Sequence, residues 1–193
     1  WEMARGGLKK LRAEHRSLVA DAAREGKSGI YCMPDGWMAA VDSGGVWLSP
    51  QAPLTHVSYR MPLEIPGNTY IEQTGVAIES EVISAPAERQ WKNAPPREAH
   101  LDMEKMAEPV EVRSPGPGDR MRLLGGKGTR KLQDIYTDLK APRWMRPLLP
   151  VVTAGGKIAW AAPLRIGHEF RITESTRKVL HLKMTGLELS FEQ

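Results

Sequence analysis

The pattern of apolar and polar positions predicts an α+β chain built mainly from β-strands. Apolar residues recur at helical spacing near the start and predict a helix over residues 4–25: Leu8, Leu11, Leu18, Val19 and Ala22. Beyond this helix the apolar runs are short and separated by turn residues, which is typical of strands. We expect strands at residues 30–33, 37–41, 46–48, 59–65, 69–73, 76–83, 110–113, 149–153, 157–161, 170–172 and 178–184.

Two of these strand patterns also predict which side chains are buried. Residues 69–73 and 76–83 flank Thr74-Gly75 and predict a hairpin. Its core candidates are Ile71, Val76, Ile78 and Val82. In residues 178–184, Val179, His181 and Lys183 alternate with Leu180, Leu182 and Met184, as on a half-buried strand.

A proline-rich, polar stretch at residues 84–98 predicts the division of the chain. It holds three prolines and few apolar residues, as linkers and long surface loops do. We therefore expect two small units, residues 1–83 and residues 99–193. The first is a helix with a β-rich part, and the second is a compact, sandwich-like α/β domain that contains a glycine-rich loop and a helix.

The charges gather in one block, residues 113–147. Nine Lys/Arg stand there against three acids, whereas residues 1–112 hold twelve basic and sixteen acidic residues. The formal net charge of +4 thus conceals a strongly basic segment behind a mildly acidic front. Such asymmetry is expected of a surface that meets a polyanion.

A predicted helix lies inside this basic block. Its apolar residues follow helical spacing: Leu132, Ile135, Tyr136 and Leu139. Thr129 would be its N-cap and Pro142 its end, with a short second helix over 142–146. Arg130 and Lys131 would then occupy the first turn, where the helix dipole disfavours each cation by ~0.3–1 kcal/mol. A phosphate held by the glycine-rich loop 125–128 would reverse that sign, while a solvated basic helix end is an equally favoured alternative.

Motifs for common enzyme chemistry are missing from the sequence. Gly26-Lys27-Ser28 lacks the earlier glycine that a P-loop requires, and Ser43-Gly44-Gly45 precedes a strand, which favours a hairpin turn over a pyrophosphatase loop. No serine or cysteine nucleophile motif occurs. His168-Glu169 could act as an acid–base pair, but turn residues of that kind are structural far more often. We predict no catalytic residues in this chain.

Metal sites and membrane segments are also not indicated. The five histidines have no metal-ligand spacing, so we expect no metal site. No apolar run approaches the ~20 residues of a membrane span, so we expect no membrane partner. The single Cys32 and the lack of a visible signal peptide fit a cytoplasmic protein. Because the chain begins with Trp1, we expect it to be part of a longer protein.

Residues 109–173 contain a series of short motifs in a recognisable order: Arg113, Pro117-Gly118-Asp119-Arg120, the glycine-rich loop with Arg130-Lys131-Leu132, Lys140 with Pro142-Arg143, Arg146, Pro150-Val151-Val152, Ile158-Ala159-Trp160, Leu164-Arg165-Ile166 and Phe170. In this order the motifs resemble the C-terminal domain of bacterial tRNA(Ile)-lysidine synthetase. The preceding residues more loosely resemble the tail of the family's middle domain. The resemblance implies an enzyme that uses ATP to attach lysine to the wobble cytidine of a tRNA(Ile) with a CAU anticodon.

The same resemblance implies a role for this part of the enzyme. ATP and Mg²⁺ would be bound by an N-terminal catalytic domain that this sequence does not contain, so we expect no cofactor here. The C-terminal domain of the family contacts the tRNA acceptor stem. We assign that contact to Arg113, Arg120, Lys127, Arg130, Lys131, Lys140, Arg143 and Arg146. Arg120 pairing with Asp119, or Arg113 acting as a buried structural partner, are alternatives.

Other partners and functions stay open at this level. The expected partners are the tRNA(Ile) acceptor stem and the N-terminal catalytic domain, with a second copy in a homodimer as an open alternative. The main rival function is a basic protein–protein interaction or scaffolding module that meets an acidic partner. A nucleotide-using enzyme with an unrecognised site ranks last. Whether this chain is itself an enzyme is therefore uncertain.

Overall fold

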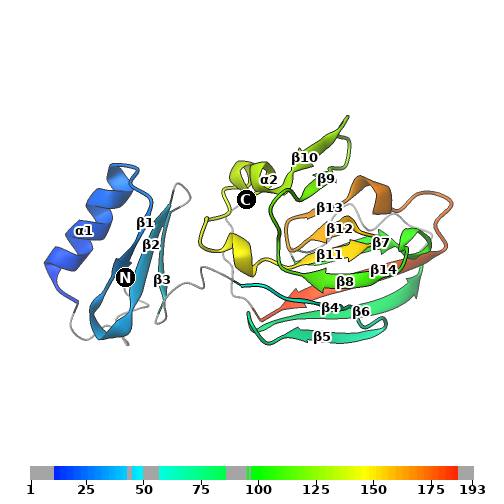
Figure 1. The fold of residues 1–193 in the computed structure, drawn as a ribbon, viewed down its shortest axis with the longest axis horizontal. Helices are drawn as coiled ribbons and strands as arrows, with labels where there is room; N and C mark the ends of the chain where they lie inside the picture. The colour runs from blue at the N-terminus through cyan, green and yellow to red at the C-terminus, as the bar shows by residue number, and fades with distance from the viewer. Residues whose placement is uncertain (1–10, 43–44, 50–56, 86–94, 96, 187–193) are drawn as a thin grey trace. The chain divides into compact units, whose positions relative to one another are not determined.

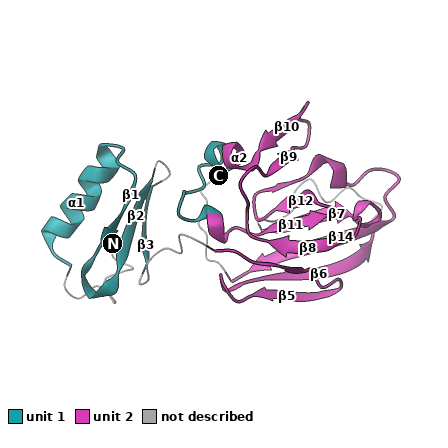
Figure 2. Cartoon of the chain, in the orientation of Figure 1, with its two compact units in different colours: residues 1–55, 136–146 teal, residues 56–135, 147–193 magenta. Residues whose placement is uncertain are grey.

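The computed structural model describes residues 11–42, 45–49, 57–85, 95 and 97–186 (Figure 1). The chain divides into two compact units, which Figure 2 colours separately. Unit 1 comprises residues 1–55 and 136–146, and unit 2 comprises residues 56–135 and 147–193. The described residues form two α-helices and several antiparallel sheets, so the mainly β prediction is confirmed. No helix in the described part of the chain is long and apolar enough to cross a membrane.

Unit 1 contains one helix and one small sheet. Helix α1 spans Ala13–Arg24, and the antiparallel sheet has the order β1-β2-β3. The strands span Gly29–Cys32, Met38–Asp42 and Gly45–Ser49. Val19 and Ala22 of the helix pack against Met33, Ala39 and Val41 in a small core. The start of the expected helix 4–25 and Ser43-Gly44 lie outside the described residues.

Unit 2 is a sandwich of two antiparallel sheets. The first sheet has the order β13-β12-β11-β8-β4 and the second has the order β5-β6-β14-β7. In the first sheet, β4 spans Arg60–Pro62, β8 Val110–Arg113, β11 Val151–Ala154, β12 Lys157–Ala161 and β13 Arg165–Ile166. In the second, β5 spans Gly67–Ile71, β6 Val76–Ser84, β7 Glu98–Asp102 and β14 Lys178–Thr185.

The core of unit 2 lies between these two sheets. Ile78 and Leu182 of the second sheet belong to the same buried cluster as Val112, Val152 and Trp160 of the first. Burial of their apolar surface is the main favourable term that holds the sheets together. The sandwich expected for the second half of the chain is therefore present, but it also uses strands from the first half.

The predicted boundary at residues 84–98 differs from this division. Strand β6 pairs with β14 from Ser84↔Lys178 to Ala77↔Thr185, and β4 pairs with β8. Strands on both sides of the proline-rich stretch thus share both sheets of unit 2. Proline and polarity signal a loop, but a loop need not separate folding units. Residues 86–94 and 96 of the expected linker lie outside the described residues.

The basic block begins in a hairpin and continues into a helix. Strands β9 (Arg120–Arg122) and β10 (Thr129–Lys131) pair antiparallel, and helix α2 spans Leu132–Asp138. The expected helix start at Arg130 was wrong, because the backbone of residues 129–131 pairs with β9 instead of entering the helix. The expected helix at 142–146 is a turn followed by a 3₁₀ helix at Arg146–Leu148. The expected strand at 170–172 was wrong: Phe170 belongs to a 3₁₀ turn at His168–Phe170, and residues 171–172 form no strand.

Candidate nucleic-acid interface

The eight predicted site residues fall in both units. Unit 2 carries five of them: Arg113, Arg120, Lys127, Arg130 and Lys131. Unit 1 carries the other three, in its segment 136–146: Lys140, Arg143 and Arg146. They differ in what their charged groups contact, and this difference decides which of them can meet a ligand.

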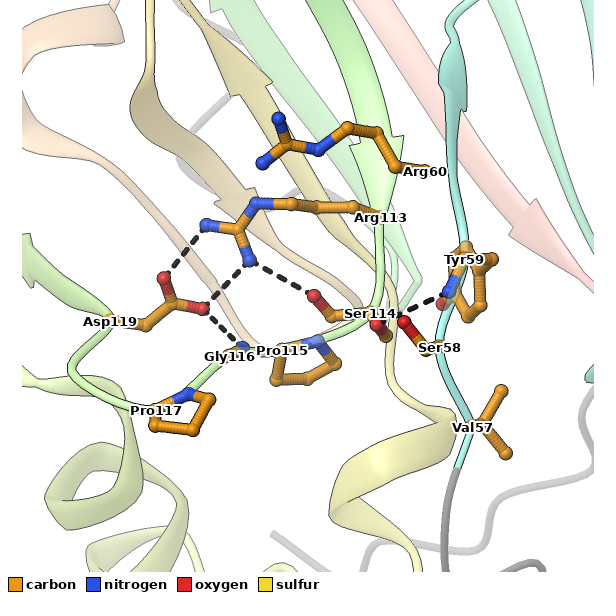
Figure 3. A pocket seen from close by; sticks show the side chains of 10 residues that line it. All are labelled: Val57, Ser58, Tyr59, Arg60, Arg113, Ser114, Pro115, Gly116, Pro117 and Asp119. Carbon is orange, nitrogen blue, oxygen red and sulfur yellow. Dashed lines mark hydrogen bonds and ion pairs between the residues drawn. The ribbon is translucent and has the colours of Figure 1, made fainter.

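Arg113 is engaged by the protein itself (Figure 3). Its guanidinium donates to both carboxylate oxygens of Asp119, at 2.8 and 2.7 Å, and to the carbonyl oxygen of Ser114 at 2.9 Å. Both side chains of this ion pair are only 14% exposed. This bidentate ion pair fixes the loop after β8. The contacts of Arg113 therefore fit the alternative role of a buried structural partner better than a contact with RNA.

Asp119 holds this loop together. Burial alone would raise the pKa of Asp119, but hydrogen bonds from Arg113 and from the amide of Gly116 outweigh it and lower that pKa. The main-chain carbonyl of Asp119 also accepts the N–H of Leu132, at 2.8 Å, where α2 begins. The residue thus stays ionised and joins the loop to the start of the helix.

A second arginine lies opposite Arg113. Arg60 of β4 pairs across the sheet with Arg113 of β8. Like charges in such cross-strand positions repel each other. The positive charge of Arg60 contributes to lowering the pKa of Asp119. Arg60 itself is 65% exposed and lies 3.9 Å from Glu111. Sequence reasoning missed this residue because the pairing of β4 with β8 joins positions more than fifty residues apart, as in Arg60↔Arg113.

These residues surround an open pocket of about 720 Å³ (Figure 3). Its wall runs from Val57 to Arg60 and from Arg113 to Pro117, and includes Asp119. The Arg113–Asp119 pair is electrically neutral, and Arg60, the third charged residue of the lining, lies 3.9 Å from Glu111. The polar lining of the pocket is compatible with a small polar group.

The β9–β10 hairpin displays the next group of cations, and Figure 1 shows it projecting from the sandwich. Residues 127–131 are all exposed. Arg120 donates to the carbonyl oxygen of Thr129 at 3.2 Å, which holds its side chain along the hairpin, and no described carboxylate lies within ion-pair distance of it. Lys127 and Lys131 have no carboxylate within ion-pair distance among the residues that the structure describes.

The segment 136–146 carries its cations on a tight turn. Lys140 has φ +53°, and its N–H donates to the carbonyl of Thr137 where α2 ends. The half-buried Arg146 donates to the carbonyl of Ala141 at 2.9 Å. The amide of Arg143 donates to Asp42 of the same unit at 2.8 Å, and its side chain is exposed. Lys140 and Arg143 therefore present charge outward, whereas Arg146 supports the turn.

The structure also gathers two histidines that are far apart in the sequence. His100 of β7 and His181 of β14 stack with their ring centres 4.4 Å apart and their planes at 6°. His181 contacts Glu81 at 2.7 Å through Nδ1 and Glu98 at 2.9 Å through Nε2. Glu98, His100 and His181 form a cluster of metal-ligand type, which sequence spacing could not reveal. The ring nitrogens of two parallel, stacked imidazoles do not converge on one metal ion. The geometry therefore favours a protonated His181 between the carboxylates of Glu81 and Glu98.

Comparison with known protein families decides what this basic domain is. A family model described as the TilS substrate C-terminal domain matches residues 110–183. Residues 110–183 are a TilS C-terminal domain. All eight predicted site residues lie inside this match, while β4, β6 and β7, which pair with strands inside it, lie outside.

Individual relatives of the TilS C-terminal domain agree. The tRNA(Ile)-lysidine synthase of Symbiobacterium thermophilum is 34% identical over 63% of this chain and 25% of its own length. That of Caldanaerobacter subterraneus is 32% identical over 67% of this chain and 27% of its own. A solved TilS C-terminal domain aligns with a TM-score of 0.59 and 27% identity, over 69% of this chain and 100% of that one. The chain thus spans about a quarter of the length of these curated relatives.

Proposed function

We propose that this chain is the tRNA-recognition part of a tRNA(Ile)-lysidine synthase and binds the acceptor stem of tRNA(Ile). The observation that carries the proposal is the β9–β10 hairpin, whose exposed cations lie within the TilS C-terminal domain. Lys127 and Lys131 have no counter-charge among the described residues, so they are available to phosphate. Arg120 and Arg130 extend the same surface.

The proposed binding is mainly electrostatic. Lysine and arginine contacts to phosphate position a protein on RNA without reading its sequence, and they release condensed counterions. Arg113 contributes indirectly, by holding the loop that leads into the hairpin. Lys140 and Arg143 supply two further exposed cations from the segment 136–146.

The chemistry of the parent enzyme belongs to another domain in this proposal. There ATP and Mg²⁺ would activate the wobble cytidine of the CAU anticodon before lysine attacks it, in the cytoplasm. This chain has no pyrophosphatase-loop motif for that step. We therefore expect the 193-residue chain alone to incorporate no labelled lysine into tRNA(Ile) in the presence of ATP. Turnover by the chain alone would contradict this division of labour.

Titration of tRNA at several salt concentrations tests the binding role. The variant Lys127→Ala with Lys131→Ala should bind tRNA more weakly and flatten the log–log salt dependence by about 0.7–0.9 per lost phosphate contact. The matched control is Lys157→Ala with Lys178→Ala, which removes two exposed lysines outside the hairpin. Equal salt slopes in the two variants would contradict the assignment. Failure of the wild-type chain to bind tRNA would favour the acidic protein partner instead.

A further inference from the structure

The tip of the β9–β10 hairpin combines an apolar side chain with the cations. Leu124 is 52% exposed. Several large apolar side chains are exposed in the described part of the chain, and Leu124 is the one that lies in the basic block, residues 113–147. Its neighbours Gly125, Gly126 and Gly128 have no side chains that could cover it. Exposed single leucines are common, but Leu124 lies in the loop that joins β9 to β10, and Figure 1 shows this hairpin projecting from the sandwich.

The tip is held in one shape before any ligand arrives. The N–H of Gly126 donates to the carbonyl of Leu123 at 3.0 Å, which closes a tight turn with Leu124 at its corner. Gly125 follows with φ +73°, a conformation that side chains disfavour. The Nε–H of Arg122 donates a hydrogen bond to the carbonyl oxygen of Gly126 at 2.8 Å, which fixes the last residue of the turn. The leucine is therefore displayed by a preformed turn, which reduces the entropy lost on binding.

Cations flank this leucine on both strands of the hairpin. Arg120 is exposed on β9, and Lys127 and Lys131 are exposed on the other side of the tip. The end of an RNA duplex has the complementary chemistry, an apolar base-pair face bounded by the phosphates of two strands. Inside the duplex that face is covered by the next base pair.

We infer that Leu124 packs on the terminal base pair of an RNA stem while the flanking cations contact the phosphates of its two strands. This inference rests on the proposed function and names the RNA feature that the hairpin recognises, namely an open duplex end. Apolar side chains are known to pack against exposed base steps in nucleic acids. Burial of the exposed half of the Leu124 side chain is worth roughly three- to tenfold in an equilibrium constant.

The test compares two RNAs that share one base-paired stem. The first is closed by a loop at one end and open at the other, and the second is closed by loops at both ends. Wild-type protein should bind the open stem roughly three- to tenfold more tightly. Leu124→Ala should bind both RNAs alike, with the salt slope of the wild type and an unchanged melting temperature. Leu124→Met keeps an apolar side chain and should keep the preference.

The outcomes separate this inference from the proposed function. Wild-type protein that binds both RNAs equally would overturn the leucine contact and leave RNA binding in place. A preference for the open stem that persists in Leu124→Ala would overturn it as well. Wild-type protein that binds neither RNA would overturn the proposed function itself. Loss of the preference in Leu124→Ala with an unchanged salt slope would support the contact.

Discussion

The β9–β10 hairpin and the outer face of the second sheet are both rich in charge, but they treat it in opposite ways. On the sheet, His181 lies between Glu81 and Glu98, and Lys183 lies 3.9 Å from Glu79. In the hairpin, residues 120–131 contain five cations and no acid. If only the number of charged residues were considered, both regions would be candidate binding surfaces. Among the described residues, the cationic side chains of the sheet lie beside carboxylates, whereas no carboxylate lies within ion-pair distance of Lys127 or Lys131.

The largest effect should come from the ion pair that supports the hairpin. Asp119→Ala removes the partner of the mostly buried Arg113 and leaves it facing Arg60, so we expect a loss of about 3 kcal/mol in the free energy of unfolding. Urea denaturation measures this loss. Arg120→Ala, an exposed neighbour on the hairpin, is the control and should change stability by less than about 0.5 kcal/mol. Similar small losses in both variants would show that the pair does not anchor the loop.

The Asp119 pair also predicts an acid limit to stability. Because the folded-state pKa of Asp119 lies below its ordinary value of 3.8, its contribution is present above pH 3.8. It is lost as the pH falls through the lower, folded-state pKa. The Asp119→Ala variant should lack this part of the acid-induced loss in pH-dependent urea denaturation.

A smaller, pH-dependent effect should come from the sheet face. Burial would lower the pKa of His181, but the hydrogen bonds to Glu81 and Glu98 outweigh it and raise the pKa above 6.5. The stabilisation is therefore complete below pH 6.5 and is lost as the pH rises through the folded-state pKa. His181→Gln should lose about 1.5 kcal/mol at pH 6 and less at pH 9. Urea denaturation at several pH values measures both.

The His100→Gln variant is the control, because the pKa of His100 is shifted in the opposite direction to that of His181. Burial, followed by the neighbouring His181, lowers the pKa of His100 below 6.5. Its contribution is thus lost as the pH falls, the opposite sign to that of His181. His100→Gln should therefore keep the decline in stability above pH 6.5, whereas His181→Gln should abolish it. If both variants decline alike above that pH, His181 is not the group responsible.

The smallest effect on stability should come from the hairpin cations. Lys127 and Lys131 are exposed and have no ion pair within the described chain, so their removal should change the free energy of unfolding by no more than about 0.5 kcal/mol. Their loss should instead appear in RNA binding. Thermal melting of Lys127→Ala with Lys131→Ala, beside the Lys157 and Lys178 control, checks this. A large drop in melting temperature would show that the two lysines stabilise the fold, as the paired charges of the second sheet do, and would contradict the difference between the two regions.

Local patterns predicted the elements of this fold better than its pairings. Ile71, Val76 and Ile78 are fully buried as expected, but Val82 of the same strand is 39% exposed. The strand at 178–184 was predicted with its buried Leu180, Leu182 and Met184, although Val179 is buried too. The proximity of Arg60 to Arg113, and of His100 to His181, depends on pairing between distant strands, which periodicity does not encode.

The same limit explains the mistaken helix start. Thr129 followed by Arg130 and Lys131 has the local features of a helix N-terminus, because threonine caps helices well. In the structure the backbone of these three residues pairs with Arg120, Met121 and Arg122. A strand pairing satisfies more backbone groups than one cap does, so the nonlocal interaction prevails. The position of the cations in the block was predicted, and the hairpin that displays them was not.

The strand order β5-β6-β14-β7 has a consequence for how the protein is made. Its inner strand β14 is translated last of the four, and His181 joins Glu81 across a sequence separation of 100 residues. On the ribosome, β6 therefore emerges several seconds before its partner, at a synthesis rate of about 5–20 residues per second. Closing so long a loop is also slow, because its entropy is lost before the contacts form. The second sheet is thus assembled only when β14 leaves the ribosome, and until then β6 presents an open edge to the cell.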